Sequence, residues 1–560
     1  MTNYQFTGGT ICAPATIPGT GAISIIRVSG KESLAIADKV IDTKGVPIAE
    51  TEGYRLRYGT VFEADGSVLD NVIVSVFRAP HSYTGENSVE ISCHASRFIV
   101  NKILELLVNA GARMAAPGEF TRRAFVNGKM DLAQAEAVAD VIASQSAASH
   151  RVAMNQLKGG FSSELKVLRE KLLTMTSLLE LELDFSEEDV EFASRKELGQ
   201  LVDDSLTHIR RLTASFSRGN AIKNGVPVAI VGATNTGKST LLNALLGEER
   251  AIVSDIAGTT RDTIEETLNI DGILFRFIDT AGIRETDETI EKIGIDRTFK
   301  KLGEAAVVLG MTDLSRGEAA VLEDADFILS KVNEMGGVKN DGLAIDGAET
   351  GRAPLAGTDG ASLAETGGTP PAETGGTTPA ETGGASQHGH GDGQERKVVI
   401  LVNKCDVADD FYRDDNGTGY GSGNDLGENM AEISGNKNVN HDNNIVSLIE
   451  NKYDNCKVIP ISAKTGKGLS TLTKTLGEIG SEITGSTDET LVTNVRHYEA
   501  LVRAASALER VRAGLHIATL PPDLIAQDLR EALYHLGEIV GEISTDETLG
   551  NIFRNFCIGK

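Results

Sequence analysis

A chain of 560 residues, 40% of them hydrophobic, is long enough for several domains with sizeable cores. Its net charge of −26 argues against a protein that coats nucleic acid through bulk charge, although a local basic patch remains compatible with it. The five cysteines are scattered without a Cys-x-x-Cys pair, which argues against a disulfide framework or a zinc site and favours a reducing compartment.

No apolar run approaches the roughly 20 residues that a membrane span requires. The segment from Met1 to Gly8 has neither the charged and apolar regions of a secretion signal nor an arginine-rich amphipathic pattern. We therefore expect a cytoplasmic protein with no membrane contact.

The first 128 residues are predicted to form an α+β domain. Short apolar runs bounded by turn residues predict strands at 21–28, 70–77 and 88–94, and three- and four-residue spacing predicts a helix at 98–108. Pro117 and Gly118 then interrupt the pattern, and Phe120 and Phe125 anchor a short helical turn.

Long amphipathic helices follow in two separate parts of the chain. The first part, 129–221, has helical spacing at 131–142, 165–183 and 198–216. The second part, 483–560, has it at 494–513 and 521–542, where Asp523 can cap the later helix. The simplest inference is one α-helical domain built from both halves, with another domain inserted between them. The acidic run at 184–191 is either a solvated helix end or a metal site.

The inserted segment begins with a phosphate-binding loop. The pattern Gly, four residues, Gly-Lys-Ser occupies 232–239, after an apolar strand at 226–231 and before a helix that continues from Thr240. Backbone N–H groups of such a loop point at phosphate oxygens beside a helix N-terminus. Lys238 would reach the β- and γ-phosphates, and Ser239 would place its hydroxyl on Mg²⁺.

Three more segments follow in the order that a GTPase requires, each after its own apolar strand. Asp279-Thr-Ala-Gly would hold Mg²⁺ through water and sense the γ-phosphate with the N–H of Gly282. Asn-Lys-Cys-Asp at 403–406 ends with Asp406, whose carboxylate can accept both N–H groups on the edge of guanine and so disfavours adenine. Ser-Ala-Lys at 462–464 can support the base. We therefore expect GTP rather than ATP as the ligand.

Together these segments predict an α/β P-loop GTPase domain over 222–482. Asn-Lys-Cys-Asp could be a chance match, but the apolar strand at 397–402 directly before it argues against that. Thr260 can give Mg²⁺ a second oxygen. Ile283 stands where GTPases of the Ras type place the glutamine that orients the attacking water, so water positioning must come from elsewhere. The candidate GTP-binding residues are Asn235, Thr236, Gly237, Lys238, Ser239, Thr240, Ser254, Asp255, Ile256, Ala257, Gly258, Thr259, Thr260, Asp279, Thr280, Ala281, Gly282, Asn403, Lys404, Asp406, Ser462, Ala463 and Lys464.

Two low-complexity insertions interrupt this domain. Ala-Glu-Thr-Gly-Gly recurs at 364–368, 372–376 and 380–384, within a stretch, 335–394, that has too few apolar residues for a core and is predicted to be disordered. A second stretch, near 408–446, is rich in Asn, Asp and Gly and is predicted to be disordered as well. His388 and His390 are either part of a solvated linker or a weak metal site.

Several motifs carry a more specific resemblance. They are Asn-Thr-Gly-Lys-Ser at 235–239, Asp-Ile-Ala-Gly-Thr-Thr-Arg-Asp at 255–262, Asp-Thr-Ala-Gly-Ile-Arg at 279–284, Ser-Tyr-Thr-Gly-Glu at 82–86, Pro-Gly-Glu-Phe-Thr-Arg-Arg-Ala-Phe at 117–125 and Phe-Cys-Ile-Gly-Lys at 556–560. The chain resembles the tRNA modification GTPase MnmE (TrmE) family over nearly its whole length, apart from the two polar insertions.

The resemblance implies GTPase domains that dimerise across their nucleotide faces and take up K⁺ in place of an arginine finger. The positions that match the K⁺ site are Asn235, Ser254, Ile256 and Thr259, with Ser254 where the family usually has threonine. Glu291 matches the glutamate that orients the attacking water, and it joins Lys238 and Asp279 as a candidate catalytic residue. From the sequence alone, Asn235 could merely shape the loop and Glu291 could be a surface charge.

The resemblance also implies that the N-terminal domain dimerises and binds a one-carbon tetrahydrofolate. The matching positions are Arg27, Glu90, Lys129 and the terminal Lys560. A carboxylate such as Glu90 can pair with the donor-rich pterin, and cations can meet the glutamate tail of the folate. Cys557 is either a nucleophile or a half-buried thiol beside this site, and no base is evident near it in the sequence.

The activity implied by the resemblance is a tRNA modification that couples to GTP hydrolysis. A homodimer would join the flavoprotein MnmG in a heterotetramer and add a carboxymethylaminomethyl-type group to carbon 5 of the wobble uridine of certain tRNAs. Folate would supply the carbon, glycine or ammonium the amine, and the partner's flavin the redox step. The alternatives are a GTPase switch in ribosome or RNA assembly without modification chemistry, and a nucleotide-dependent structural protein without hydrolysis.

Overall fold

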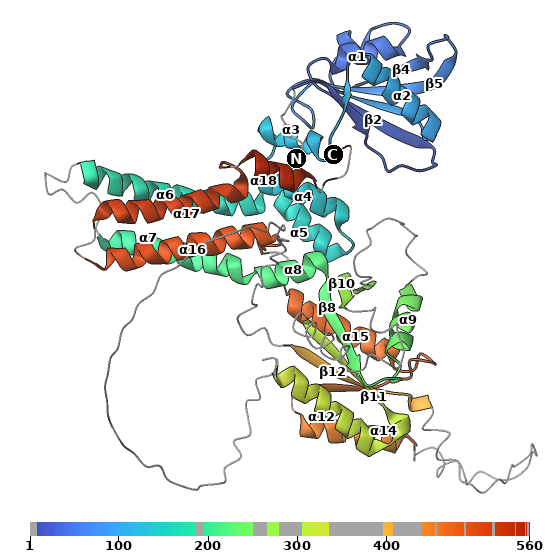
Figure 1. Cartoon of the computed structure of the whole chain (residues 1–560), viewed down its shortest axis with the longest axis vertical. Coiled ribbons are helices and arrows are strands. Elements are labelled where there is room, and N and C mark those ends of the chain that lie inside the picture. Colours follow the sequence, from blue (N-terminus) through green and yellow to red (C-terminus); the bar gives the residue numbers. More distant parts are fainter. Residues whose placement is uncertain are drawn as a thin grey trace, which may run out of the picture. The chain divides into compact units, whose positions relative to one another are not determined.

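The computed structural model describes residues 8–184, 195–249, 266–278, 305–334, 396–406, 438–453, 456–485, 489–517, 521–543, 545–554, 556 and 559. These residues pack into two compact units (Figure 1). The first unit comprises 1–227, 245–280 and 469–560, and the second comprises 228–244 and 281–468.

The first unit begins with a seven-stranded sheet in the order β3-β4-β5-β6-β2-β1-β7. Neighbouring strands are antiparallel, except that β7 runs parallel to β1. The strands are β1 (Ile11–Pro14), β2 (Ile23–Ser29), β3 (Ile41–Asp42), β4 (Arg55–Phe62), β5 (Val68–Phe77), β6 (Ser88–His94) and β7 (Arg113–Met114).

Helices cover one face of this sheet. Alternate residues of β5, among them Val72, Val74 and Val76, are buried with apolar side chains of α1 (Ser33–Val40) and α2 (Arg97–Asn109) in one core. The opposite face leaves large apolar side chains of β4 and β5 exposed. α3 (Glu119–Val126) follows the sheet, with Phe120 fully buried.

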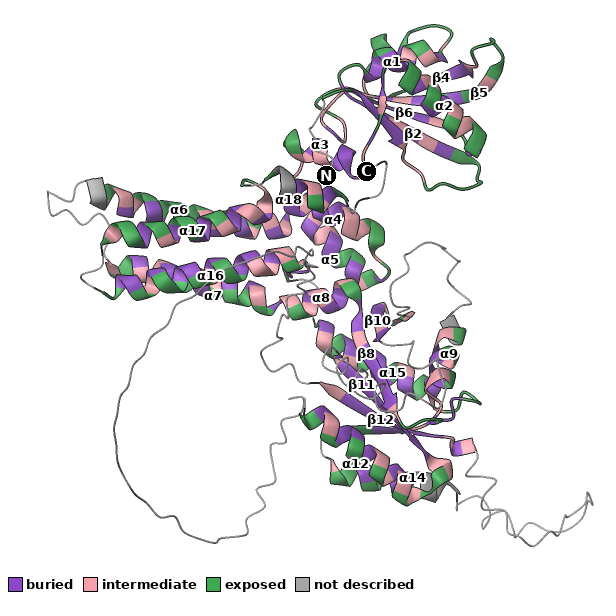
Figure 2. Cartoon of the chain, viewed as in Figure 1, coloured by how far each residue is buried: buried purple, intermediate pink, exposed green. Residues whose placement is uncertain are grey.

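A helical bundle joins two distant parts of the chain. The contributing helices are α4 (Leu132–Ala143), α5 (Ala147–Leu157), α6 (Gly160–Asp184), α7 (Arg195–Ala214), α8 (Phe216–Asn224), α16 (Val495–Leu515), α17 (Pro522–Val540) and α18 (Asp546–Arg554). The buried stripes of α6 and α7 share one core with those of α16 and α17 (Figures 1 and 2). This packing confirms the predicted α-helical domain made of two halves.

The first unit also holds an antiparallel hairpin and one more helix. β9 (Glu266–Ile270) pairs with β10 (Ile273–Ile278) in register Ile273 to Ile270. α15 (Leu469–Thr484) packs on this hairpin, since Gly480 closely approaches Phe275 and leaves no room for a larger residue there.

The second unit is an α/β layer. Its strands lie in the order β13-β12-β11-β8, all parallel, and are β8 (Val226–Gly232), β11 (Val307–Asp313), β12 (Lys397–Asn403) and β13 (Cys456–Pro460). They are mostly buried, as strands covered on both faces are. The helices are α9 (Lys238–Glu249), α12 (Glu318–Glu334) and α14 (Asn438–Lys452).

The elements confirm most of the expected order and correct it at two places. The predicted strands correspond to β2, β5, β6, β8, β10, β12 and β13, while β1, β3, β4, β7, β9 and β11 are additional. α14 begins at Asn438, inside the stretch predicted to be disordered, because Ile445 and Ile449 are one helical turn apart and both are buried. Asp523 does not cap α17: the cap position is Pro521, and Asp523 lies in the first turn, where its charge favours the helix dipole.

Four cysteines lie in the part of the chain that the structure describes. Cys12, Cys93 and Cys456 are free thiols there, and the Cys405 thiol donates to the carbonyl oxygen of Val402 at 3.2 Å. Burial raises the pKa of the Cys12 and Cys93 thiols to about 11, so both stay protonated and unreactive near neutral pH.

Candidate functional site

The carboxyl ends of the parallel strands meet at one edge of the sheet in the second unit. Met311 of β11 is in register with Gly232 of β8, and Asp313 is in register with Asn403 of β12. In turn, Val402 of β12 is in register with Pro460 of β13. The phosphate loop and the two predicted base-recognition segments therefore emerge at the same edge, where parallel α/β sheets bind ligands.

The phosphate loop has the backbone that its sequence demands. Asn235 and Gly237 have φ of 62° and 97°, in the left-handed region that asparagine and glycine tolerate best. A Cβ at Gly237 would lie 2.5 Å from the side-chain nitrogen of Asn403, so only glycine fits there. The Lys238 ammonium donates to the carbonyl oxygens of Gly232 (3.0 Å) and Ala233 (2.8 Å), and burial lowers its pKa.

Asn403 joins the phosphate loop to the last predicted segment. Its Nδ2 donates to the carbonyl oxygen of Thr236 at 2.7 Å, and its Oδ1 accepts from the N–H of Ala463 at 3.0 Å. The side chain is buried, so both bonds are shielded from water. Thr236, Asn403 and Ala463 thus lie in contact, although they are far apart in sequence.

The neighbouring Lys404 forms an ion pair that the sequence did not indicate. Its Nζ donates to Oδ2 of Asp313 at 2.6 Å. Burial raises the pKa of Asp313, but hydrogen bonds from Lys404 and Ser315 outweigh it and hold that pKa below its usual range. Asp313 ends the buried strand β11, and a polar residue after an apolar run was the signal that could have found it.

The Ser-Ala-Lys segment forms a tight loop after β13. The Ser462 hydroxyl is buried and accepts from the N–H of Thr465 at 3.2 Å, while Lys464 is exposed. Asp406 follows Asn403 by three residues and is half-buried. Ser239 and Thr240 lie in the first turn of α9, directly after Lys238.

A large share of the predicted site falls outside the described residues. Those candidates are Ser254, Asp255, Ile256, Ala257, Gly258, Thr259, Thr260, Asp279, Thr280, Ala281, Gly282 and Glu291. Their roles stay predictions. Within the ranges that the structure describes, no group of three or more His, Cys, Asp or Glu side chains could hold a metal ion.

Two family models match most of the chain. The family model described as "MnmE helical domain" matches residues 132–557, and "GTP-binding protein TrmE N-terminus" matches residues 10–129. A tRNA modification GTPase MnmE from Parabacteroides distasonis is 44% identical over 554 residues, which covers 98% of this chain and 100% of that protein. The chain belongs to the tRNA modification GTPase MnmE family.

Further relatives carry the same name. The MnmE from Bacteroides thetaiotaomicron is 44% identical and covers 98% of this chain and 99% of that protein. The MnmE from Porphyromonas gingivalis is 42% identical, and the match covers 100% of this chain and 99% of that protein. Membership of the MnmE family therefore applies to the whole chain, including the two units described above.

The N-terminal sheet brings together two of the four predicted folate-binding residues of the MnmE family. Arg27 of β2 is paired in register with Glu90 of β6, and its Nε and Nη2 both donate to Oε1 of Glu90, at 3.0 and 2.8 Å. No described residue donates to Oε2, which leaves an acceptor available for a ligand. The rings of Tyr83 and Phe120 lie 5.1 and 5.7 Å from the guanidinium carbon.

The C-terminal tail contacts the same place. Nη1 of Arg27 donates to the carbonyl oxygen of Gly559 at 3.4 Å. Gly559 has φ of 97°, and a Cβ there would lie 2.1 Å from the carbonyl oxygen of Pro14, so the close approach requires glycine. Lys560 and Cys557 lie outside the described residues. Lys129 donates to the carbonyl oxygen of Pro80 at 3.0 Å. In the part of the chain that the structure describes, no hydrogen bond or ion pair joins Lys129 to Arg27 or Glu90.

A buried ionic network, missed from the sequence, holds the two aromatic rings beside Arg27. Arg123 is almost fully buried and donates to Glu86 (3.0 Å) and Glu119 (3.0 Å). The Tyr83 hydroxyl hydrogen-bonds that of Thr121 at 2.8 Å. The motifs at 82–86 and 117–125 therefore pack against each other, which spacing in sequence could not reveal.

Proposed function

We propose that this chain hydrolyses GTP and that hydrolysis serves the modification of the wobble uridine of certain tRNAs. The observation that carries the proposal is that the Asn403 side chain hydrogen-bonds to both the phosphate loop and the Ser462 loop. This observation supports the proposal because it joins the predicted phosphate loop to the two predicted base-recognition segments, in a chain of the MnmE family.

The described residues divide the work of nucleotide binding. Lys238 would exchange its two loop carbonyls for β- and γ-phosphate oxygens, and Ser239 would give Mg²⁺ a hydroxyl ligand together with Thr260. Asp406 would accept both N–H groups of the guanine edge. Lys404, held by Asp313, would support the base from the side.

Hydrolysis also requires positive charge near the transferring phosphoryl group and a residue that orients the attacking water. Because Ile283 cannot orient water, we assign that role to Glu291, and we assign K⁺ to Asn235, Ser254, Ile256 and Thr259. Asn235 supports this assignment, because it is exposed within the loop and its left-handed backbone is tolerated by few residues. K⁺ would supply positive charge near the transferring phosphoryl group.

The N-terminal site is proposed to hold a one-carbon tetrahydrofolate through Arg27, Glu90, Lys129 and Lys560. The donor set fits: Oε2 of Glu90 can accept from the pterin, and the Tyr83 and Phe120 rings lie beside the pair. Bound there, the folate would supply the carbon of the added group. Lys129 could meet the folate's glutamate tail only after leaving the Pro80 carbonyl.

The remaining proposals concern the oligomeric state, the partner molecules and the cellular compartment. Leu56, Tyr58 and Ile73 lie on the uncovered face of the N-terminal sheet and are 67%, 65% and 48% exposed, which supports a homodimer through this face. MnmG, in a heterotetramer, would provide the flavin, and the complex would act on tRNA in the cytoplasm. No helix within the described ranges is both long and apolar enough to cross a membrane.

GTP turnover in potassium against sodium tests the proposed hydrolysis. We expect GTP but not ATP to be hydrolysed, with turnover at least about tenfold higher in K⁺, and we expect Lys238→Ala to abolish it. Lys474→Ala is the matched control, because Lys474 is an exposed lysine on α15 outside the predicted nucleotide site. Equal low rates in both cations would contradict the potassium role, and ATP turnover as fast as GTP turnover would contradict the assignment of Asp406.

A further inference from the structure

A shallow groove of about 840 Å³ runs along α5 in the first unit. Its lining includes Gln145, His150, Arg151, Asn155 and Lys158, together with Asn269 of the β9–β10 hairpin, and none of the described lining residues is acidic. The hairpin is held there by Asn269, whose Nδ2 donates to the carbonyl oxygen of Gln145 at 3.0 Å. The groove is therefore part of the folded surface and not of a loose loop.

The charge along this groove differs from that of the rest of the chain. The chain has 80 acidic residues, yet none occurs between Asp140 and Glu164. His150, Arg151 and Lys158 are all exposed in that interval. Glu266 and Asp271 of the hairpin do not belong to the described lining of the groove, and Asp271 lies against Gly477 of α15.

The basic side chains follow one face of the helix. His150, Met154 and Lys158 recur at four-residue steps, and Arg151 and Asn155 flank them. His150 and Lys158 are about 12 Å apart along the axis at 1.5 Å per residue. The amide of Asn155 between them, and the side chains of Ser144, Gln145 and Ser146 elsewhere in the groove, can bond phosphate and ribose oxygens.

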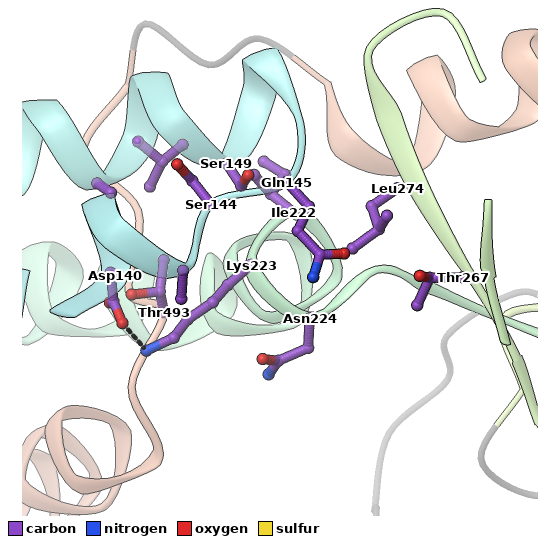
Figure 3. A pocket seen from close by; sticks show the side chains of 13 residues that line it. Asp140, Ser144, Gln145, Ser149, Ile222, Lys223, Asn224, Thr267, Leu274 and Thr493 are labelled. Atoms are coloured by element: carbon purple, nitrogen blue, oxygen red, sulfur yellow. Dashed lines mark ion pairs between the residues drawn. The ribbon is translucent and has the colours of Figure 1, made fainter. Parts of the chain in front are cut away.

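The composition favours a phosphate backbone over a protein partner. Protein interfaces have aromatic and apolar centres, whereas Ala147 and Met154 are the only apolar side chains among the described residues that line this groove. The adjoining pocket of about 250 Å³ offers no comparable charge, since its Lys223 is 2.8 Å from Asp140 (Figure 3). Ser144 and Gln145 line both the groove and this pocket, whereas Asp140 and Lys223 line the pocket and are not part of the groove.

We propose that the α5 groove, defined by His150, Arg151, Asn155 and Lys158, docks the phosphate backbone of the tRNA substrate. This inference rests on the proposed function, which supplies the kind of nucleic acid. The groove gives a chain of net charge −26 a local surface that a polyanion can approach.

Charge reversal in the groove tests this proposal on the full chain. The variants are Lys158→Glu and the double Arg151→Glu/Lys158→Glu; the control is Lys171→Glu/Lys196→Glu, which reverses two exposed lysines on α6 and α7. Anisotropy of a labelled transcript with uridine at the wobble position would follow binding, without and with the flavoprotein partner, over about 50 to 300 mM KCl. Unfolding midpoints and GTP turnover verify that each variant is folded.

We expect the double variant to weaken tRNA binding about tenfold or more and to lower the salt slope by about two, while the control stays near wild type. Wild-type affinity and salt slope in both groove variants would overturn the proposal. Unchanged tRNA binding with loss of the flavoprotein complex would overturn it in favour of an acidic protein partner. Failure of the wild-type chain to bind tRNA in either format would instead contradict the proposed function itself.

Discussion

Single residues determine how the candidate nucleotide site is held together. Asn403 uses both polar atoms of its buried amide, one toward Thr236 and one toward Ala463. Its predicted role was contact with the nucleotide, but its bonds in the structure are to the two loops. Its effect on GTP is therefore expected to act through loop position rather than through a bond to the base.

Asn403→Ala should weaken nucleotide binding through that loop position. The change leaves the Thr236 carbonyl and the Ala463 N–H without their partner, at a cost of about 1–3 kcal/mol for each buried group. We expect GTP affinity to fall at least about tenfold in a titration with a fluorescent guanine nucleotide. Asn451→Ala, at an exposed position of α14, is the control. Equal affinities for the two variants would show that the tie is dispensable.

At the scale of elements, a buried ionic cluster fastens α4 to α16 in the helical bundle. Glu136 accepts from Arg496 Nε at 3.0 Å and Nη2 at 2.9 Å, and it lies 2.6 Å from Nε2 of His497. Burial raises the pKa of Glu136, but His497 and Arg496 outweigh it and hold that pKa at about 2. Burial lowers the pKa of His497, so its ring is neutral and donates from Nε2.

The stability of the bundle should therefore fall as the pH falls below the ordinary histidine pKa of about 6.5. Below that pH the unfolded chain takes up a proton that the buried His497 does not, and the loss is up to about 1.4 kcal/mol per pH unit. The contribution of Glu136 is lost only at lower pH, as the pH falls from its ordinary range through about 2.

Urea unfolding between pH 8 and pH 5 measures this effect. His497→Gln keeps a donor toward Glu136 but does not titrate, so its stability should change less with pH than that of wild type. His516→Gln, at an exposed position after α16, should follow the wild-type curve. A slope for His497→Gln as steep as that of wild type would contradict the buried neutral histidine.

How far the sequence predicts these elements depends on how local their signals are. The phosphate loop was predictable, because the spacing of Gly232, Gly237 and Lys238 itself encodes the backbone conformation. α14 was misread, because the polar residues before it outweighed Ile445 and Ile449. The Arg123 network was not predictable, since its partners Glu86 and Glu119 are brought together only by packing of the sheet on α3.

In the N-terminal site, some contacts were predictable from the sequence and others were not. Arg27 and Glu90 were grouped by family resemblance, and the antiparallel register of β2 and β6 explains their contact. Lys129 follows α3 and reaches the Pro80 carbonyl instead of the pair. Asp313 ends the apolar run of β11, which is a signal in the sequence, but its pairing with Lys404 depends on the strand order that puts β11 beside β12.

At the scale of the whole molecule, the first unit unites both ends of the chain. Gly559 packs on Pro14 and Arg27, so residues close to the C-terminus complete a site that begins in the second strand. The bundle likewise needs α16 and α17 from after the inserted segment. In the sequence, the GTPase segments thus lie between two parts of the chain that fold together.

The wobble-uridine content of tRNA tests the central claim most directly. Nucleosides from total tRNA of cells lacking the gene would be compared by mass spectrometry with those of cells complemented by wild type or by Lys238→Ala. We predict that the carboxymethylaminomethyl-type uridine is lost on deletion, returns with the wild-type chain and stays absent with Lys238→Ala. Unchanged modification in the deletion, or full recovery with Lys238→Ala, would contradict the account.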